Sequence, residues 1–170
     1  ILEVISGARH RFKSPADVGR EPGRKLTARI YKAYLEQKSA YGRLDFDDLI
    51  LKPIELFKTQ PEVLATWRKR FGHILVDEFQ DTSLSQLEFL KLLASEHRSI
   101  CVVGDDDQSI YGWRGARIEN ILNFEETFSD AKAIALEQNY RSTGHILDAA
   151  NAVIVKNSLR RDKKLWTDAG

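Results

Sequence analysis

Two adjacent carboxylates, Asp77 and Glu78, follow directly after the apolar run Ile74-Leu75-Val76. Neighbouring residues at the end of a strand point in different directions, so one carboxylate can hold a hydrated Mg²⁺ while the other accepts a proton from an attacking water. Phosphoryl transfer needs this division of labour, because that reaction depends on positioning and charge neutralisation. The alternative is structural, with Asp77 capping the following turn and Glu78 simply solvated.

A second polar cluster, VVGDDDQSIYGWRGA (residues 102–116), follows another apolar run. Gly104 allows a sharp turn after the strand, and Gln108 offers a neutral amide that can reach a terminal phosphate or a positioned water. Three successive aspartates, residues 105–107, form either a solvated turn or a metal-binding and hydrogen-bonding cluster. Of the three, Asp105 lies next to the strand and is the best placed for chemistry.

The same cluster contains an aromatic and basic group, Tyr111, Trp113 and Arg114, with the last two between Gly112 and Gly115. A large flat ring on a loop with flexible joints can stack on an unpaired base, an interaction worth about 1–3 kcal/mol per base and indifferent to sequence. The competing interpretation is a Trp113 ring buried against Tyr111.

The third cluster, LEQNYRS (residues 136–142), presents Tyr140 and Arg141 just before a predicted helix. An arginine at the mouth of a nucleotide site can neutralise charge that develops on a transferred phosphate. Taken alone, such an arginine also fits a surface ion pair.

Short apolar runs precede all three clusters, at residues 74–76, 100–103 and 133–136, and predicted helices over residues 83–97 and 118–128 separate them. Alternation of short apolar strands with helices is typical of a parallel sheet with helices on both faces. The sequence therefore predicts an α/β fold. Because ligands bind beyond the carboxyl ends of parallel strands, we expect the three clusters to meet at one pocket.

Further helices are predicted before this α/β region. Apolar periodicity predicts a helix over residues 25–41, which Gly42 ends. Asp45 is positioned to cap a second helix that runs to about residue 58, with Pro53 marking either a kink or a boundary. Pro61 opens a third helix, which ends near residue 71.

Polar and charged residues predict how other segments begin. Ser83 and Gln86 have the spacing of a capping box, and Ser142 is placed to cap the last helix. Residues 9–25 contain prolines and glycines among charges, which predicts an irregular connection. The tail, residues 157–164, is basic.

The composition, 170 residues of which 42% are hydrophobic, suits a globular protein. With 26 Lys and Arg against 25 Asp and Glu, the net charge of +1 gives no overall field to attract a polyanion, so nucleic-acid binding must come from local placement of charge. The single cysteine, Cys101, excludes an internal disulfide framework and is expected to be a core residue in a reducing compartment. The sequence contains no apparent membrane span or signal peptide, and its start at Ile1 without any methionine indicates a segment of a longer protein.

Taken in order, VDEFQDT and the two later clusters resemble motifs II, III and IV of the UvrD/Rep/PcrA group of superfamily 1 DNA helicases. The upstream LDFDDLI (residues 44–50) and the closing KKLWTDAG (residues 163–170) are similar to the same group. The resemblance implies an incomplete RecA-like P-loop NTPase lobe. Residues 1–43 would be the end of a helical insertion subdomain, residues 44–135 the C-terminal part of the first lobe, and residues 136–170 the start of the second.

The resemblance also implies roles at an ATP site. Asp77 and Glu78 would form the metal site, with Asp77 as the Mg²⁺-binding acid and Glu78 as the base that activates water. Gln108 would sense the γ-phosphate, and Arg141 would be an arginine finger with Tyr140 beside it.

Residues Gln80 and Asp81 would link this site to its neighbours, and Tyr111, Trp113 and Arg114 would bind DNA, with Trp113 as the stacking ring. The whole protein would be an ATP-dependent helicase that walks 3′ to 5′ along single-stranded DNA and unwinds single-strand/double-strand junctions in repair or replication. The resemblance places it in the bacterial cytoplasm, at the nucleoid, with accessory repair or replication proteins as further partners.

A phosphate-binding loop of the form GxxxxGK[ST] is missing from these 170 residues. The nearest stretch, GREPGRK (residues 19–25), has the wrong spacing and no preceding apolar strand. We therefore expect the segment alone neither to bind ATP tightly nor to hydrolyse it.

Two other classes of function fit parts of the sequence. A metal-dependent nuclease or phosphatase would use Asp77, Glu78 and residues 105–107 as a carboxylate cage, but no histidine lies among these ligands, and such a site does not require Gln108 or Trp113. A non-catalytic nucleic-acid-binding module would keep Trp113 and the basic tail, but would not need the acids, the amide and the arginine together.

Overall fold

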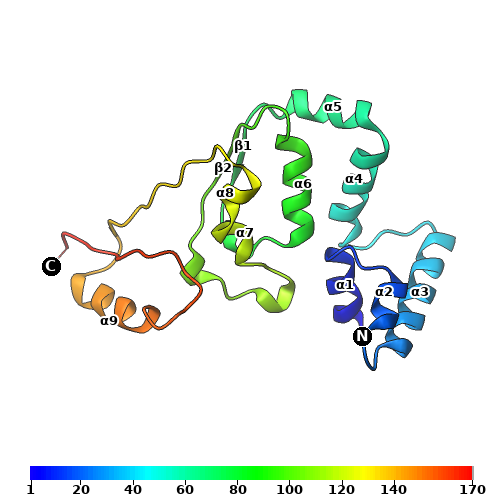
Figure 1. The fold of residues 1–170 in the computed structure, drawn as a ribbon, viewed down its shortest axis with the longest axis horizontal. Coiled ribbons are helices and arrows are strands. Elements are labelled where there is room, and N and C mark those ends of the chain that lie inside the picture. Colours follow the sequence, from blue (N-terminus) through cyan, green and yellow to red (C-terminus); the bar gives the residue numbers. More distant parts are fainter. Residues whose placement is uncertain (170) are drawn as a thin grey trace.

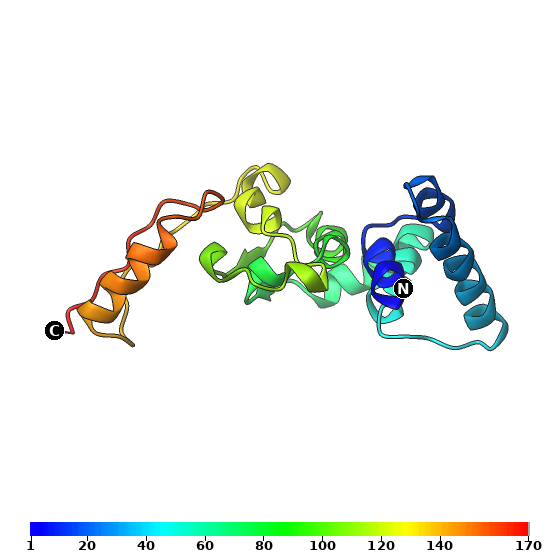
Figure 2. The ribbon, with the colours of Figure 1, turned by 90° about the horizontal axis from the view of Figure 1, so that it is seen from below.

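The structure, a computed structural model, describes residues 1–169 as an elongated molecule, with the N-terminus in a helical group toward one end and the C-terminus at the other (Figure 1, Figure 2). Its elements in chain order are α1 (Leu2–His10), α2 (Pro15–Arg20), α3 (Lys25–Ala40), α4 (Asp48–Thr59), α5 (Pro61–Arg70), β1 (Ile74–Val76), η1 (Phe79–Asp81), α6 (Leu84–Ala94), β2 (Ile100–Val102), η2 (Asp106–Gln108), η3 (Gly112–Arg114), α7 (Glu119–Leu122), α8 (Phe124–Thr127) and α9 (Gly144–Ile154). No helix among the described residues combines the length and the apolar character needed to cross a membrane.

Helices α1, α2 and α3 pack around a small core of their own. This core consists of Ile5, Ala8, Val18 and Tyr31. A capping box begins α2, in which the Asp17 N–H donates to Ser14 Oγ at 3.2 Å and the Ser14 N–H donates to the Asp17 carboxylate at 2.9 Å. The prediction of an irregular connection over residues 9–25 is therefore wrong for α2, because Pro15 lies at the first helical position, where a missing N–H leaves no hydrogen bond unmade. Residues 11–14 and 21–24 do form irregular connections between helices.

The other predicted starts and stops of helices in this part of the chain are confirmed. Gly42 follows α3 with φ +58°, the left-handed conformation that glycine adopts without strain. Asp45 Oδ1 accepts the Asp48 N–H at 2.9 Å and so caps the turn that leads into α4. Pro53 lies inside α4, and Pro61 is the first residue of α5.

A second core joins α4, α5 and α6 to the first strand. Phe57, Leu64 and Leu93 are its buried residues, and Ile74 of β1 packs against them. The predicted capping box begins α6, where Ser83 Oγ accepts the Gln86 N–H at 3.3 Å and Gln86 Oε1 accepts the Ser83 N–H at 2.8 Å.

Strands β1 and β2 pair in parallel, with Ile74 opposite Ile100 and Val76 opposite Val102. The α/β class and the parallel pairing are thus confirmed. A two-residue hairpin cannot connect parallel neighbours, and here α6 makes the crossover from one strand to the next (Figure 1).

Several expectations about the sheet are wrong. Residues 133–136 form no strand, and Ile134 is 81% exposed. One face of the sheet lacks a helical cover within residues 1–169, since Leu75 is 82% exposed and Cys101, expected in the core, is exposed as well. The physical reason is the same in each case: an apolar run is buried only where a partner strand or helix covers it.

Two helices also differ from their predicted bounds. The helix expected over residues 118–128 is split into α7 and α8 at Asn123, whose φ of −106° and ψ of 25° interrupt the helix. The last helix begins after Thr143 instead of Ser142.

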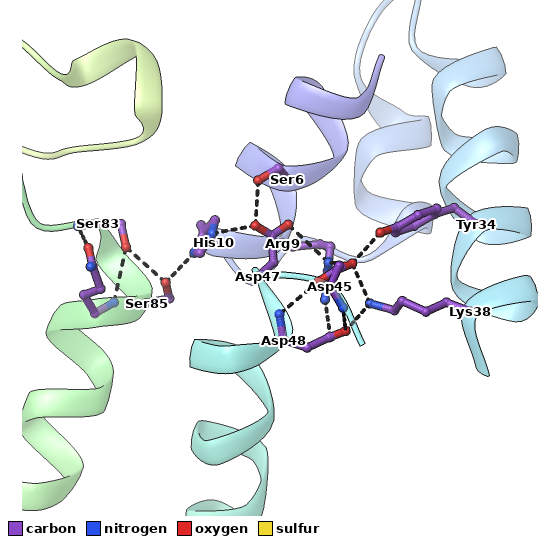
Figure 3. A network of polar contacts seen from close by, with 11 residues as sticks. Ser6, Arg9, His10, Tyr34, Lys38, Asp45, Asp47, Asp48, Ser83 and Ser85 are labelled. Atoms are coloured by element: carbon purple, nitrogen blue, oxygen red, sulfur yellow. Dashed lines mark hydrogen bonds and ion pairs between the residues drawn. The ribbon is translucent and has the colours of Figure 1, made fainter. Parts of the chain in front are cut away.

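A network of charges around Arg9 connects the helical group to the start of α4 (Figure 3). Arg9 is 7% exposed, and its guanidinium donates to Asp45 at 2.7 Å, Asp47 at 3.1 Å and Asp48 at 2.5 Å. Lys38 of α3 donates to Asp45 at 2.9 Å and Asp48 at 2.7 Å. A buried guanidinium is tolerated only when its donors are paired, so these acids fix how α1 and α3 meet α4.

The network continues to α6 through His10. One ring nitrogen of His10 lies 3.1 Å from Asp47 Oδ1, and the other lies 2.6 Å from Ser85 Oγ, in the first turn of α6. Ser85 is fully buried. The helical group and the strand-bearing group are therefore joined by polar contacts as well as by the chain (Figure 3).

Tyr34 of α3 donates its hydroxyl proton to Asp45. This hydrogen bond, with burial and the charge of Asp45, raises the pKa of Tyr34 to about 12, because a phenolate beside a carboxylate is repelled and cannot donate. Burial works against ionisation of Asp45, but the hydrogen bonds from Tyr34 and Lys38 outweigh it and hold the pKa of that carboxyl below its usual value.

We expect Tyr34→Phe to lower the free energy of unfolding by about 1.5 kcal/mol at pH 8, the usual contribution of a hydrogen bond to a charged group. Because the folded pKa lies above that of the unfolded chain, this stabilisation is complete below pH ~10 and is lost as the pH rises toward 12. Urea denaturation of both proteins between pH 8 and 11.5 measures the difference. Tyr41→Phe, at a position 68% exposed, is the control and should match wild type; a Tyr34→Phe difference that stays constant with pH would contradict the assignment.

Candidate active site

The carboxyl ends of β1 and β2 are joined by one buried side chain. Gln80 is 1% exposed, its Nε2 donates to Glu78 Oε2 at 2.8 Å, and its Oε1 accepts the Asp105 N–H at 3.0 Å. The Phe79 N–H also donates to the Val103 carbonyl at 2.9 Å. We call the two contacts of the amide the Gln80 bridge; through it the structure brings the first two sequence clusters together.

Gly104 makes the Gln80 bridge sterically possible. A Cβ atom on Gly104 would lie 2.5 Å from Gln80 Oε1, 2.9 Å from Ile121 Cδ1 and 3.0 Å from the Phe79 nitrogen. The sharp turn expected at this position is not the reason for glycine, because the φ of Gly104 is not in the left-handed region. The close approach of two loops is the reason.

Both acids after β1 are exposed, and Glu78 has an unusual backbone. Its φ of 49° and ψ of 44° are left-handed, a conformation that costs a residue with a side chain about 1–2 kcal/mol. Asp77 Oδ1 accepts the Glu78 N–H at 2.9 Å, so the local role foreseen for Asp77 is present in part. Strain of this kind concentrates at functional sites, which agrees with a chemical role for Glu78.

These two acids fit a magnesium ion. Within residues 1–169, neither Asp77 nor Glu78 forms an ion pair, and each keeps one carboxylate oxygen that accepts no hydrogen bond. No group of three or more His, Cys, Asp or Glu side chains in the described chain has the geometry of a complete metal site. Mg²⁺ usually takes one or two carboxylates and completes its shell with water and substrate phosphates, so a pair of exposed acids suffices.

The three aspartates after β2 form an ion-paired cluster with residues from the tail. Lys163 Nζ donates to Asp105 Oδ1 at 2.5 Å and Asp106 Oδ1 at 2.6 Å, and Arg160 donates twice to Asp107, both at 2.9 Å. Of the two sequence interpretations, hydrogen bonding describes residues 105–107, and the solvated turn does not. A carboxylate cage for a nuclease loses support, because these acids already bind cations of the chain.

Gln108 is exposed, and its Nε2 donates to Asp105 Oδ2 at 2.6 Å. Burial works against ionisation of Asp105, but the hydrogen bonds from Lys163 and Gln108 outweigh it and lower the pKa of this carboxyl. Burial likewise opposes the charge of Lys163, yet its bonds to Asp105 and Asp106 raise its pKa. Both shifts favour the charged forms of Asp105 and Lys163.

The aromatic group lies on an exposed loop. Trp113 is 73% exposed and Tyr111 37%, so the interpretation of a buried tryptophan is wrong. The Arg114 guanidinium lies 4.6 Å from the Trp113 ring centroid and 5.2 Å from that of Tyr111. Gly115 has φ +92°, which a side chain would strain, and it ends the η3 turn that presents both rings.

The third cluster lies apart from the first two. Tyr140 and Arg141 are exposed, and no hydrogen bond or ion pair in residues 1–169 joins either one to Asp77, Glu78 or Gln108. The chain that follows α8 leads away from the sheet toward α9 (Figure 1). Asn139 Oδ1 accepts the N–H groups of Arg141 at 2.9 Å and Ser142 at 2.7 Å. The structure thus brings two of the three predicted clusters together.

Sequence reasoning missed the partners of the acidic residues. The sequence shows that the tail is basic but not what it binds; in the structure Arg160 and Lys163 bind residues 105–107 directly. A block of three acids and a block RRDKK (residues 160–164) in one chain are complementary in charge, which was the available signal. Similarly, the stretch LDFDDLI (residues 44–50) contains Asp45, Asp47 and Asp48, which bind the buried Arg9.

Comparison with known proteins decides the family. Residues 1–129 match the model of the UvrD/REP helicase N-terminal domain. The chain belongs to the UvrD/REP helicase family. It is 51% identical over 169 residues to proteins named ATP-dependent DNA helicase PcrA from Staphylococcus epidermidis and Staphylococcus aureus. These alignments cover 98% of this chain and 23% of each relative, so the chain spans about a quarter of their length.

The match to the UvrD/REP helicase model includes the first two clusters and ends before the third. The alignment with the PcrA relatives covers nearly the whole chain. The resemblance proposed from the sequence is thereby confirmed at the level of the family.

Gly104→Ala should destabilise the protein by about 1–3 kcal/mol, because the added methyl group meets the Gln80 amide and the Phe79 backbone in a packed site. Gly72→Ala is the matched control, since a Cβ at Gly72 meets nothing within 4 Å and its φ is not left-handed. Urea denaturation measures both. Equal effects of the two substitutions would contradict a close approach at Gly104.

Proposed function

We propose that this chain is part of an ATP-dependent DNA helicase that moves 3′ to 5′ along single-stranded DNA and unwinds duplexes at single-strand/double-strand junctions. The observation that carries the proposal is the Gln80 bridge, which holds Glu78 beside the loop of Asp105 and Gln108. Acids and an amide at the carboxyl ends of neighbouring parallel strands suit hydrolysis of a bound nucleotide. The name of the Staphylococcus relatives supports the same activity for the longer protein.

In this proposal Asp77 and Glu78 hold Mg²⁺, and Glu78 accepts a proton from the attacking water. The ion would supply charge neutralisation at the phosphates of ATP. Glu78 suits a base because one of its carboxylate oxygens is fixed by Gln80, which leaves the other to meet water. The conformation of the side chain is therefore set before the substrate arrives, which favours catalysis.

Gln108 and Arg141 complete the proposed catalytic set, and Tyr140 lies beside Arg141 at the nucleotide. Gln108 donates one Nε2–H to Asp105, so its amide oxygen can still accept from a water and its second Nε2–H can donate to a phosphate oxygen. The Arg141 guanidinium forms no hydrogen bond in the described chain and is exposed. An arginine in that state can approach a transferred phosphate without breaking an existing ion pair.

Tyr111, Trp113 and Arg114 are the proposed contacts to DNA. Two exposed rings with a guanidinium close to both offer base stacking and a positive charge for the backbone in one loop. Such contacts do not depend on base sequence, which suits a motor that moves along any strand. The loop belongs to the same segment as Gln108, so a change at the nucleotide reaches the rings through few residues.

Further parts of the proposal concern the longer protein. We infer that residues 1–43 end a helical subdomain, that residues 44–135 belong to a first RecA-like lobe, and that residues 136–170 begin a second. The separate hydrophobic cores of α1–α3 and α4–α6 support the first boundary. A cytoplasmic, nucleoid-associated role in DNA repair or replication, with accessory proteins as partners, suits the proposed substrate.

In the full-length protein, Glu78→Gln should reduce ATP turnover by about 100-fold or more, because it removes the proton acceptor with little change of shape. Binding to single-stranded DNA should stay close to wild type. A steady-state ATPase assay and fluorescence anisotropy with a labelled dT oligonucleotide measure the two effects. The control is Glu62→Gln on the exposed side of α5, which should change neither; unchanged turnover in Glu78→Gln would remove the role given to Glu78.

Trp113→Ala should weaken binding of single-stranded DNA by about 5-fold to 150-fold, the equivalent of about 1–3 kcal/mol of stacking, or should uncouple ATP hydrolysis from unwinding. Trp113→Phe keeps an aromatic ring and should retain most of both properties. Oligonucleotide binding and the ratio of ATP hydrolysed to base pairs unwound are the readouts. Wild-type values of both in Trp113→Ala would show that the ring does not contact DNA.

A further inference from the structure

The acidic loop, residues 105–107, and the basic segment, residues 160–163, are 53 to 58 residues apart in the chain but form one partly buried ion cluster. The side chains of Lys163 and Asp106 are 17% and 7% exposed, and those of Arg160 and Asp107 are 11% and 10% exposed. The Arg161 N–H adds a hydrogen bond of 2.8 Å to Asp106 Oδ2. Ion pairs with this degree of burial and two-point geometry are stronger than exposed pairs.

Asp105 connects this cluster to the proposed catalytic amide. Its Oδ1 accepts from Lys163 and its Oδ2 accepts from Gln108 at 2.6 Å. Its backbone N–H donates to Gln80 Oε1, and its Oδ1 also accepts the Asp107 N–H at 3.1 Å. Lys163 therefore fixes the carboxylate that fixes Gln108, without touching Gln108 itself.

Charge gives Lys163 a second effect on the same loop. Three adjacent carboxylates lie at the strand ends where the proposed nucleotide, itself an anion, would bind. Lys163 contacts all three acids, with Asp107 at 3.4 Å, and Arg160 binds Asp107. Without these cations the acids would repel one another and the phosphates, because like charges at this spacing are unfavourable.

The basic segment is also tied to the chain that carries Arg141. The Trp166 N–H donates to the Glu137 carbonyl at 3.0 Å, and the Asn139 N–H donates to the Trp166 carbonyl at 2.7 Å. Asn139 in turn accepts the Arg141 N–H at 2.9 Å. Residues 160–166 thus contact the Gln108 loop at one end and the Arg141 segment at the other.

We propose that Lys163 is a positioning residue for Gln108: it acts through Asp105, and the segment of residues 160–166 transmits a change at the Gln108 loop to the segment of Arg141. The inference rests on the proposed function, since it assigns Gln108 to the nucleotide. It adds a residue of the tail to the machinery of the site.

The test uses the full-length protein with Lys163→Gln, Lys163→Arg and the control Lys156→Gln, an exposed lysine after α9. Lys163→Gln should lower kcat of DNA-stimulated ATP hydrolysis by about 10-fold or more, a loss typical of a misplaced catalytic group. Lys163→Arg should restore most of kcat, and Lys156→Gln should equal wild type. In nucleotide-free protein, amide hydrogen exchange at Asp107 and Gln108 should be faster in Lys163→Gln.

A double-mutant cycle separates positioning from general stabilisation. If Lys163 acts through Asp105, then Lys163→Gln combined with Asp105→Asn should lose no more kcat than the worse single variant. Additive losses, a wild-type kcat in Lys163→Gln, or an equal loss in Lys163→Arg would each overturn the proposal. If Glu78→Gln abolishes turnover while Lys163→Gln does not lower it, only this inference fails; if Glu78→Gln leaves turnover unchanged, the proposed function fails first.

Discussion

The Gln80 bridge is the contact on which the geometry of the candidate site depends. A primary amide that is 1% exposed must satisfy its donor and its acceptor inside the protein, because leaving either unpaired would cost about 1–3 kcal/mol. Glu78 and the Asp105 N–H are the partners it finds, and they belong to different strand ends. Loss of either contact would leave a buried polar atom of Gln80 without a hydrogen-bond partner. The loops after β1 and β2 therefore keep a fixed separation. Gly104 is required because no other residue leaves room for the amide between them.

Charge in this molecule is organised in local groups that pair acids with bases. The net charge of +1 conceals three acids that bind Arg160 and Lys163, and another three that bind Arg9 and Lys38. Both groups are partly buried, so their ion pairs are less screened by salt than pairs at the surface. The basic tail consequently has less charge available for DNA than its sequence suggests. Arg114, stacked on two exposed rings, is better placed for that purpose.

Features that depend on neighbouring residues were predictable from the sequence, and features that depend on distant partners were not. The caps at Ser83 and Asp45 and the stop at Gly42 follow from local pattern. The parallel pairing of β1 and β2 is the exception among contacts between distant residues, because two short apolar runs separated by one helix predict it. The strand expected at residues 133–136 failed because apolar character alone does not supply a neighbour to pair with. For the site, the residue types indicate the acids, the amide and the rings. Only the fold shows that Gln80 joins the loop of Glu78 to the loop of Asp105 and Gln108. The sequence leaves open whether Trp113 is exposed or buried, and the structure shows that it is exposed.

A series of hydrogen bonds, from Arg9 and His10 through Ser85 and Ser83 to Thr82, connects the helical group to the candidate site. Ser85 Oγ meets His10 in the Arg9 network and lies 3.1 Å from Ser83 Oγ at the cap of α6. Thr82, the residue before that cap, accepts a hydrogen bond from Asn120 of α7 and follows directly on η1, which contains Gln80. The side chains of Ser83, Ser85, Thr82 and Asn120 are less than 9% exposed, and both ring nitrogens of His10 are hydrogen-bonded. Movement of any of them would leave a buried polar partner unsatisfied. The position of α1 is therefore tied, through the first turn of α6, to the strand ends where the acids lie.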